Sequence, residues 1–406
     1  MVAMKRLYKQ IIEEHLKEHQ QMVFIAGPRQ VGKTTLAKDT EKITHHFNYY
    51  NWDNMSHREQ LIYDANAIFE DIPFNKVSKT KPIVVFDEVH KYKKWKSLIK
   101  GLFDTYKENS RIIVTGSAKL NIYQKFGDSL MGRYFLYRIH PFSIGELHHK
   151  KPSKDYFLHN PSMISHKKME ALLSFGGFPD PYLKQDKRYY TRWQSLRKSQ
   201  LFTDDIRELS NIQDIGLMEL LYELLQEYSG QLMSYSNLAR KIKITSPTVK
   251  KWIGLFEQIY YCFKVSPWQK NISRSLLKEP KMYLFDWSLV RDPGAKIENF
   301  VASHLLKAVH FWTDCGLGEF GLYFLRDKDK REVDFLIVQD GSPWLIIEVK
   351  SSGNKSLNPQ LKYFQEQTKA PHAIQIAYDM PHEDIDFRDL GKPMIIPMST
   401  FLSQLP

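Results

Sequence analysis

The chain has 406 residues, more than one hydrophobic core usually organises, so we expect two to four domains. Hydrophobic residues make up 42% and charged residues 26%, which is typical of a soluble globular protein and excludes a disordered or membrane-embedded chain. The net charge of +12, from 58 basic against 46 acidic residues, favours a polyanionic partner such as DNA or RNA.

Cysteine usage and hydropathy indicate a cytoplasmic protein. Cys262 and Cys315 are too few and too far apart for a disulfide framework, a redox pair or a zinc ribbon. Residues 1–21 alternate apolar with charged residues and lack the continuous apolar run of a signal peptide. No apolar run approaches the roughly 18 residues of a transmembrane helix, so we expect no membrane association.

The first motif predicts a phosphate site between a strand and a helix. The apolar run 22–26 is followed directly by GPRQVGKTT and then by a helix-like stretch. Its glycines let backbone N–H groups face a phosphate, Lys33 reaches the β and γ phosphates, and Thr34 places a hydroxyl on Mg²⁺. The alternative is a glycine-rich connector in a parallel sheet. The predicted nucleotide-binding residues are Gly27, Pro28, Arg29, Gln30, Val31, Gly32, Lys33, Thr34 and Thr35.

A second apolar run ends in two acids. Residues 83–88 read IVVFDE, as expected of a strand buried on both faces with carboxylates at its end. Asp87 is predicted to hold the hydration shell of Mg²⁺ with the nucleotide. Glu88 is predicted to polarise the attacking water as general base, which favours hydrolysis over simple nucleotide binding.

Two further candidates complete the predicted catalytic set. The run 111–117 ends in Thr115 and Ser117, and of the two we expect the Ser117 hydroxyl to contact the γ phosphate or the water. Arg133 is a candidate arginine finger, because a transferring phosphoryl group needs a well-placed cation. A surface arginine is the equal alternative, and a finger supplied in trans would require a homo-oligomer.

Together these residues resemble the AAA-type ATPases, and more narrowly a family of bacteria and archaea in which an AAA domain precedes a C-terminal region of undefined function. The resemblance implies ATP as nucleotide and an α/β fold with a five-stranded parallel sheet covered by helices on both faces. The matching segments are GPRQVGKTT (27–35), DEVHK (87–91), TGSAKL (115–120), LMGRYF (130–135), HPFSIGEL (140–147) and GGFPDPYL (176–183).

The middle of the chain predicts a helical lid or linker and then a winged helix. Residues 230–265 read as helix, turn, helix and strand, with Ser246 as N-cap and Pro247 in the first helical position. A second helix of this kind can enter a major groove, although such modules also serve as packing or protein-contact units. The expected buried face is Val249, Trp252, Ile253 and Phe256, and the outward residues are Thr248, Lys250 and Lys251.

The C-terminal part carries a spacing typical of a metal site. Strand-like runs at 331–338 and 344–350 flank a turn, and a hairpin symmetric about Gly341 places Asp334 opposite Glu348. Like charges so placed repel each other, and a divalent cation would remove the repulsion. The same register places Glu332 opposite Lys350.

This spacing resembles the core of PD-(D/E)xK nucleases, with Glu298 on the preceding helix. The resemblance implies that Asp334 and Glu348 bind a second Mg²⁺, with Glu298 and Lys350 nearby, and that Lys350 orients or deprotonates the water. The alternative is a nuclease-like fold whose acids form ordinary surface pairs, such as Glu332 with Lys350.

The predicted domains divide the charge unevenly. They are an AAA P-loop ATPase domain (1–150, net +8), a helical lid or linker (151–210, net +4), a winged-helix-like module (211–270, net +2) and a nuclease-like domain (271–406, net −2). A polyanion would therefore contact mainly the first half. The sequence favours an ATP-hydrolysing protein that couples nucleotide state to a C-terminal region engaging nucleic acid. The alternatives are an ATP-controlled switch with a protein partner and an inert C-terminal domain, and a nuclease restrained by ATP.

Overall fold

A computed structural model describes residues 6–70, 80–116, 130–149, 151–207, 214–269, 279–353 and 356–406. The chain divides into two compact units, one ending at His140 and one beginning at Pro141. The first boundary therefore lies ten residues before the expected position at 150. In the described part of the chain, no helix is both long and apolar enough to cross a membrane.

The first unit alternates short strands and helices. Its elements are α1 (Tyr8–Glu18), β1 (Met22–Ala26), α2 (Lys33–Asp39), a 3₁₀ turn η1 (Thr40–Ile43), β2 (Phe47–Asn51), α3 (Met55–Tyr63), α4 (Ala67–Glu70), β3 (Ile83–Asp87), η2 (Val89–Lys91), α5 (Trp95–Tyr106), β4 (Arg111–Gly116) and β5 (Tyr134–Arg138).

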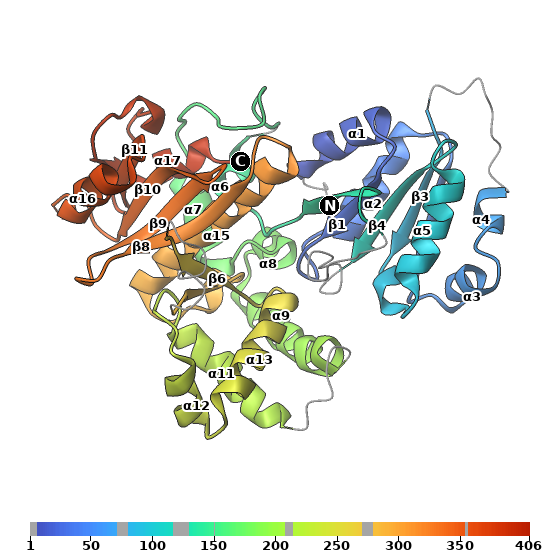
Figure 1. Cartoon of the computed structure of the whole chain (residues 1–406), viewed down its shortest axis with the longest axis horizontal. Helices are drawn as coiled ribbons and strands as arrows, with labels where there is room; N and C mark the ends of the chain where they lie inside the picture. The colour runs from blue at the N-terminus through green and yellow to red at the C-terminus, as the bar shows by residue number, and fades with distance from the viewer. Residues whose placement is uncertain are drawn as a thin grey trace. The chain divides into compact units, whose positions relative to one another are not determined.

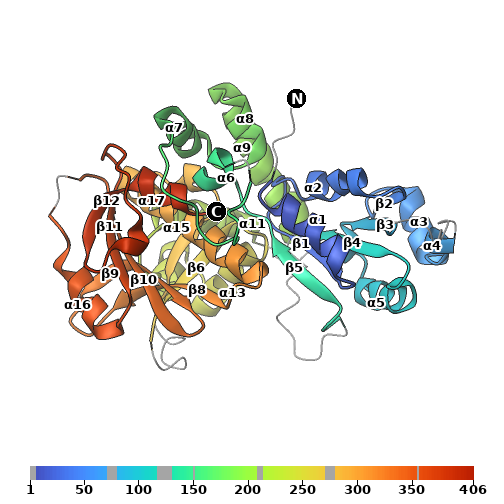
Figure 2. The ribbon, with the colours of Figure 1, turned by 90° about the horizontal axis from the view of Figure 1, so that it is seen from above.

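These strands form one five-stranded parallel sheet in the order β2-β3-β4-β1-β5. Every residue of β1, β3 and β4 is buried, as continuous apolar runs predict for a parallel sheet covered on both faces. Phe24 and Phe86 pack with Ile99 of α5 in one core. Figure 2 shows α5 on one side of these strands and α1 and α2 on the other, so the expected α/β fold is confirmed.

The parallel register brings the two sequence motifs to one edge. Ala26 pairs with Gly116, and Asp87 pairs with Thr115, so the carboxyl ends of β1, β3 and β4 lie together. In open parallel sheets, ligands bind at this edge. The GPRQVGKTT loop begins directly after Ala26, which places it beside Asp87.

The second unit is larger and mixed. Its elements are α6 (Ile144–His148), α7 (His166–Phe175), α8 (Pro179–Lys184), α9 (Lys187–Gln200), a π-helical turn η5 (Leu201–Ile206), α11 (Ile215–Glu227), α12 (Tyr235–Ile242), α13 (Ser246–Gln258), β6 (Cys262–Pro267), β7 (Lys281–Leu284), η6 (Trp287–Leu289), α15 (Pro293–Asp314), β8 (Phe320–Arg326), β9 (Glu332–Gln339), β10 (Ser342–Lys350), α16 (Pro359–Thr368), β11 (His372–Ala377), η7 (Phe387–Asp389), β12 (Met394–Pro397) and α17 (Met398–Gln404).

Its seven strands form a single mixed sheet in the order β12-β11-β10-β9-β8-β6-β7 (Figure 1). Leu361 and Phe364 of α16 pack on Leu336 and Ile346 of the sheet, so α16 covers part of one face of the sheet. The expected boundary at 270 falls inside this sheet, because β6 pairs antiparallel with β7 and parallel with β8. The strand that was expected to complete a separate winged helix is thus a strand of the C-terminal sheet.

The helix–turn–helix itself forms as expected, with a shift of one residue at its second helix. Thr245, not Ser246, is the N-cap of α13, because its hydroxyl accepts a hydrogen bond from the backbone amide of Thr248. Pro247 occupies the first turn, where its missing N–H costs nothing. The expected apolar face is buried, and Lys250 and Lys251 are exposed.

Candidate functional site

At two positions, the loop after β1 adopts a backbone conformation that glycine alone accommodates without strain. Gly27 has φ +151°, and a Cβ there would lie 2.2 Å from the carbonyl oxygen of Ile139. Gly32 has φ +97° and is the N-cap of α2. Both φ values lie where L side chains are strained, so the glycine spacing of the motif is a requirement of this loop.

Lys33 is buried beneath the loop. Its Nζ donates to the carbonyl oxygens of Gly27, at 3.0 Å, and Pro28, at 2.7 Å. The ammonium is therefore held against the backbone that the motif predicts to surround a phosphate. Both of these acceptors are neutral backbone oxygens.

Asp87 is buried and accepts hydrogen bonds from three hydroxyls. Thr34 Oγ1, on α2, donates to Asp87 Oδ2 at 3.0 Å, and Thr115 Oγ1, on β4, donates to Oδ1. The third donor is the Tyr49 hydroxyl of β2, which sequence reasoning missed. Its strand reads FNYYN and is half-buried throughout, so no apolar run marked it as part of the sheet edge.

Glu88 follows Asp87 in a left-handed conformation, with φ 57°, which is uncommon for a residue with a side chain. Its Oε2 is buried, lies 3.5 Å from Nε2 of His90 and accepts no hydrogen bond from the described residues. Burial raises the pKa of Glu88, and the neighbouring Asp87 raises it further against the opposing effect of Lys33. A carboxylate of raised pKa with an uncommitted oxygen is suited to accept a proton.

Arg6 is a second residue that the motifs did not reveal. Its buried guanidinium donates to the carbonyl oxygens of Val31, at 2.7 Å, and His140, at 2.5 Å. It therefore ties the phosphate loop to the end of β5 within the same unit. Nothing in the sequence around Arg6 distinguishes it from the other basic residues near the N-terminus.

The remaining predicted loop residues differ in exposure. Pro28 and Val31 are buried, Arg29 is half-buried, and Gln30 and Thr35 are exposed. Gln30 also adopts a left-handed conformation, with φ 61°. A phosphate contact by Thr35 stays a prediction. Ser117 lies outside the described residues.

The structure does not bring Arg133 to this site. Arg133 directly precedes β5, and Tyr134 pairs with Met22 at the amino ends of the strands. It therefore lies at the edge of the sheet opposite the phosphate loop, where it pairs with Asp104 at 2.8 Å. The prediction that Arg133 acts as an arginine finger within its own chain is therefore wrong, because the carboxyl end of β5 lies beside the loop and Arg133 precedes the amino end. A role in trans stays a prediction.

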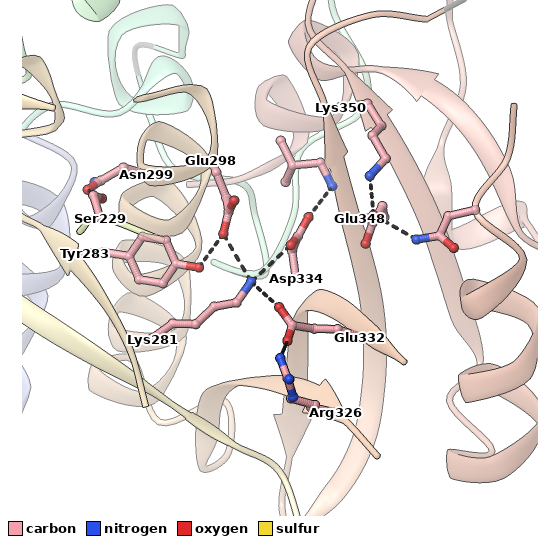
Figure 3. A network of polar contacts seen from close by, with 12 residues as sticks. Ser229, Lys281, Tyr283, Glu298, Asn299, Arg326, Glu332, Asp334, Glu348 and Lys350 are labelled. Atoms are coloured by element: carbon pink, nitrogen blue, oxygen red, sulfur yellow. Dashed lines mark hydrogen bonds and ion pairs between the residues drawn. The ribbon is translucent and has the colours of Figure 1, made fainter. Parts of the chain in front are cut away.

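The C-terminal acids surround a lysine that sequence reasoning overlooked (Figure 3). Lys281, the first residue of β7, is buried, and its Nζ lies 3.3 Å from Glu298 Oε1, 2.9 Å from Glu332 Oε1 and 3.2 Å from Asp334 Oδ1. Burial disfavours the ammonium, but the three carboxylates outweigh it and raise the pKa of Lys281. Burial and the nearby Asp334 raise the pKa of Glu298 to about 7.

The hairpin register agrees with the expected one only beyond a bulge. Next to the turn, Ser342 pairs with Gln339, one residue out of the expected register. A shift between Pro343 and Leu345 then pairs Ile347 with Phe335. Continuing that pairing by one residue sets Asp334 opposite Glu348, as expected.

The acids nevertheless do not share an open metal site. Asp334 Oδ2 accepts the amide of Val349 at 3.0 Å. Glu348 Oε1 accepts from Lys350 and, at 2.8 Å, from Asn358. Within the described ranges, no group of three His, Cys, Asp or Glu residues is arranged to hold a metal ion. Of the two predicted Mg²⁺ ligands, Asp334 pairs with Lys281 and Glu348 pairs with Lys350, so each carboxylate already has a cation beside it.

The expected alternative of a surface pair between Glu332 and Lys350 is also not what forms. Glu332 contacts Lys281 and, through Oε2, Arg326 at 2.6 Å. Lys350 pairs instead with Glu348 on its own strand. The first difference follows from Lys281, which pairs with both Glu332 and Asp334.

Comparison with protein families divides the chain into three parts. Residues 19–148, which contain the phosphate loop and the acid pair, match the family described as AAA domain. These residues are an AAA domain. Residues 166–292 and 293–401 match two further families, each described as a domain of unknown function. Lys281 thus belongs to the first of these regions and its three acids to the second.

The relatives of known sequence span most of the chain at low identity. An uncharacterized protein of Mycobacterium tuberculosis is 21% identical over 356 residues, covering 84% of this chain and 73% of that protein. One from Methanocaldococcus jannaschii is 23% identical over 435 residues, covering 98% and 88%.

The solved structures that resemble the chain superpose loosely. AMPPCP-bound DnaA from Aquifex aeolicus has a TM-score of 0.32 at 15% identity, covering 62% of this chain and 86% of that one. The Aeropyrum pernix ORC1 protein in complex with DNA has a TM-score of 0.31 at 14% identity, covering 72% and 92%. Superpositions of this quality carry no argument about function.

The Tyr49→Phe substitution tests the hydroxyl cluster on Asp87. It removes one of three donors to a buried carboxylate, and a hydrogen bond to a charged group contributes about 1.5–3 kcal/mol. We expect faster hydrogen–deuterium exchange at the amides of β2 and β3, corresponding to a loss of opening free energy of about this size. Tyr63→Phe, at a residue 85% exposed, is the control. Equal exchange in the two variants would contradict the cluster.

Proposed function

We propose that the AAA domain binds ATP with Mg²⁺ and hydrolyses it to ADP and phosphate. The observation that carries this proposal is the hydrogen bond from Thr34 Oγ1 to Asp87 Oδ2 at 3.0 Å, beside the buried ammonium of Lys33. It joins the hydroxyl of the loop to the carboxylate of β3, the oxygen pair that a nucleotide-bound Mg²⁺ needs.

The loop fits the phosphates of ATP. Its glycines curl the backbone, and the loop leads into α2, so N–H groups and the start of a helix face the same point. Lys33 can exchange its carbonyl partners for phosphate oxygens, because a phosphate adds the attraction of opposite charges to the hydrogen bond that the ammonium makes with a neutral carbonyl. The loop is thus a preformed site whose cation becomes available on binding.

Thr34 and Asp87 fit Mg²⁺ because both present oxygen and already lie in contact. Bound Mg²⁺ would neutralise charge on the β and γ phosphates. Tyr49 and Thr115 hold Asp87 in place through their hydroxyls, so its orientation does not depend on the cation.

Glu88 is the proposed general base. Its buried Oε2 accepts no hydrogen bond from the described residues, and its pKa is raised. A base must be deprotonated to act, so hydrolysis should fall as pH falls through this raised pKa. The acidic limb of the rate profile should therefore lie above pH 4.5, the ordinary pKa of a glutamate.

We propose further that the C-terminal region engages nucleic acid through α13. Lys250 and Lys251 are exposed on the second helix of a helix–turn–helix, and the chain carries a net charge of +12. The competing function is an ATP-controlled switch with a protein partner and an inert C-terminal domain. The ion pairs of Lys281 with three acids favour that inert state for the nuclease-like part.

Two substitutions separate nucleotide binding from hydrolysis. Lys33→Ala should abolish ATP binding, because the loop loses its cation. Glu88→Gln should bind ATP normally and hydrolyse it at least about 100-fold more slowly, the usual contribution of a general base. Lys42→Ala, at an exposed lysine of η1, is the control.

Fluorescent-nucleotide titration and phosphate release measure both effects. Tight ATP binding by Lys33→Ala would refute the assignment of the loop. A full rate in Glu88→Gln would refute the assignment of the base and leave the loop standing.

The double substitution Lys250→Ala with Lys251→Ala tests the nucleic-acid proposal. If both lysines contact phosphates, the slope of log affinity against log salt should fall by about 2, roughly one unit for each lost contact. Lys167→Ala with Lys168→Ala removes a neighbouring pair of exposed lysines on α7 and should leave the slope unchanged. Absence of DNA and RNA binding by the unmodified chain at low salt would reject the proposal in favour of the protein switch.

A further inference from the structure

Lys281 makes one contact for each proton of its ammonium. A lysine has three donors and no acceptor. Its Nζ lies within 3.3 Å of one oxygen from each of Glu298, Glu332 and Asp334. The three donors are thus matched by three carboxylates, which come from α15 and β9 (Figure 3).

The opposite oxygens of two of these acids are also engaged. Arg326 donates to Glu332 Oε2 at 2.6 Å, and the Val349 amide donates to Asp334 Oδ2 at 3.0 Å. At Glu298 the Tyr283 hydroxyl adds a second donor to Oε1, at 2.7 Å. The cluster is therefore a connected network rather than a set of acids facing solvent.

Glu348, the other acid of the nuclease-like spacing, stands apart from Lys281. Its Oε2 is buried and accepts no hydrogen bond from the described residues, while Oε1 is occupied by Lys350 and Asn358. Mg²⁺ usually keeps several waters and binds through one or two carboxylates, and Glu348 offers it a single open oxygen here.

Burial makes the lysine hard to replace. The Lys281 side chain is 4% exposed, and a charge removed from water is tolerated only with partners. A divalent cation placed among these acids would face the ammonium at close range, so it would have to expel Lys281 first. The three carboxylates already share the charges of Lys281 and Arg326, so an incoming divalent cation would compete with two cations in place.

We propose that Lys281 is the resident cation of this cluster and occupies the place of the metal ion in a nuclease-like sheet. In the C-terminal unit, the Lys281 ammonium on β7 then links this strand to α15 and β9 through ion pairs. The unit does not cleave phosphodiesters with a divalent metal. The proposal goes beyond the function of the AAA domain and does not depend on ATP hydrolysis. Any engagement of nucleic acid by this unit is then binding without cutting.

The test is metal binding by the full chain without nucleotide. Lys281→Met keeps much of the side-chain volume and removes the charge, leaving three carboxylates without their shared cation. Isothermal titration with Mn²⁺ should show binding at least tenfold tighter than in the unmodified chain. Adding Asp334→Asn to Lys281→Met should remove the gain.

Lys264→Met is the matched control, because Lys264 lies on β6 of the same sheet and pairs with Glu257 away from the cluster. It should leave Mn²⁺ binding unchanged. A folded Lys281→Met chain that gains no Mn²⁺ binding would overturn the proposal.

The unmodified chain decides the matter even if Lys281→Met does not fold. We expect no Mn²⁺ binding that Asp334→Asn abolishes, and no Mg²⁺- or Mn²⁺-dependent cleavage of plasmid or single-stranded DNA. Mn²⁺ binding or cleavage that is lost in Asp334→Asn would show that a metal displaces Lys281, and the proposal would fail.

Discussion

A charge that leaves water must meet a partner inside the protein, and this constraint shapes both ends of the chain. Lys33 and Lys281 are both buried, at 5% and 4% exposure. Lys33 meets neutral carbonyl oxygens of its own loop, whereas Lys281 meets three carboxylates from α15 and β9. A carboxylate adds the attraction of opposite charges to a hydrogen bond, so its three acids hold Lys281 more strongly than two neutral carbonyls hold Lys33.

The same contrast separates the two groups of acids. Asp87 is oriented by three hydroxyls, which donate a hydrogen bond without cancelling its charge. Asp87 is therefore held in place by neutral donors. Asp334, by contrast, has its charge countered by Lys281. Asp87 ends β3 and Asp334 lies near the start of β9, and the partners of the two acids differ as well.

Local motifs allowed the phosphate loop and the two acids at the end of β3 to be predicted from sequence, and the resemblance to AAA-type ATPases implied the parallel sheet. For the loop and the acids the deciding residues are adjacent in the chain, as with Gly32 and Lys33. The residues that were missed reach the sites from distant segments. Lys281 lies 53 positions from Asp334, and Tyr49 lies 38 from Asp87. Their roles depend on strand order and register, which composition does not reveal.

Arg133 shows that a suitable residue type alone does not predict a site, since this arginine lies at the wrong edge of the sheet.

We propose two cation sites of different kinds: one depends on a bound nucleotide, and the other is filled by a lysine. The most direct measurement is anomalous diffraction from crystals grown with Mn²⁺ and a non-hydrolysable ATP analogue. We predict a manganese peak beside Thr34 and Asp87 and none in the Lys281 cluster. A peak between Asp334 and Glu348, or none beside Asp87, would contradict the account.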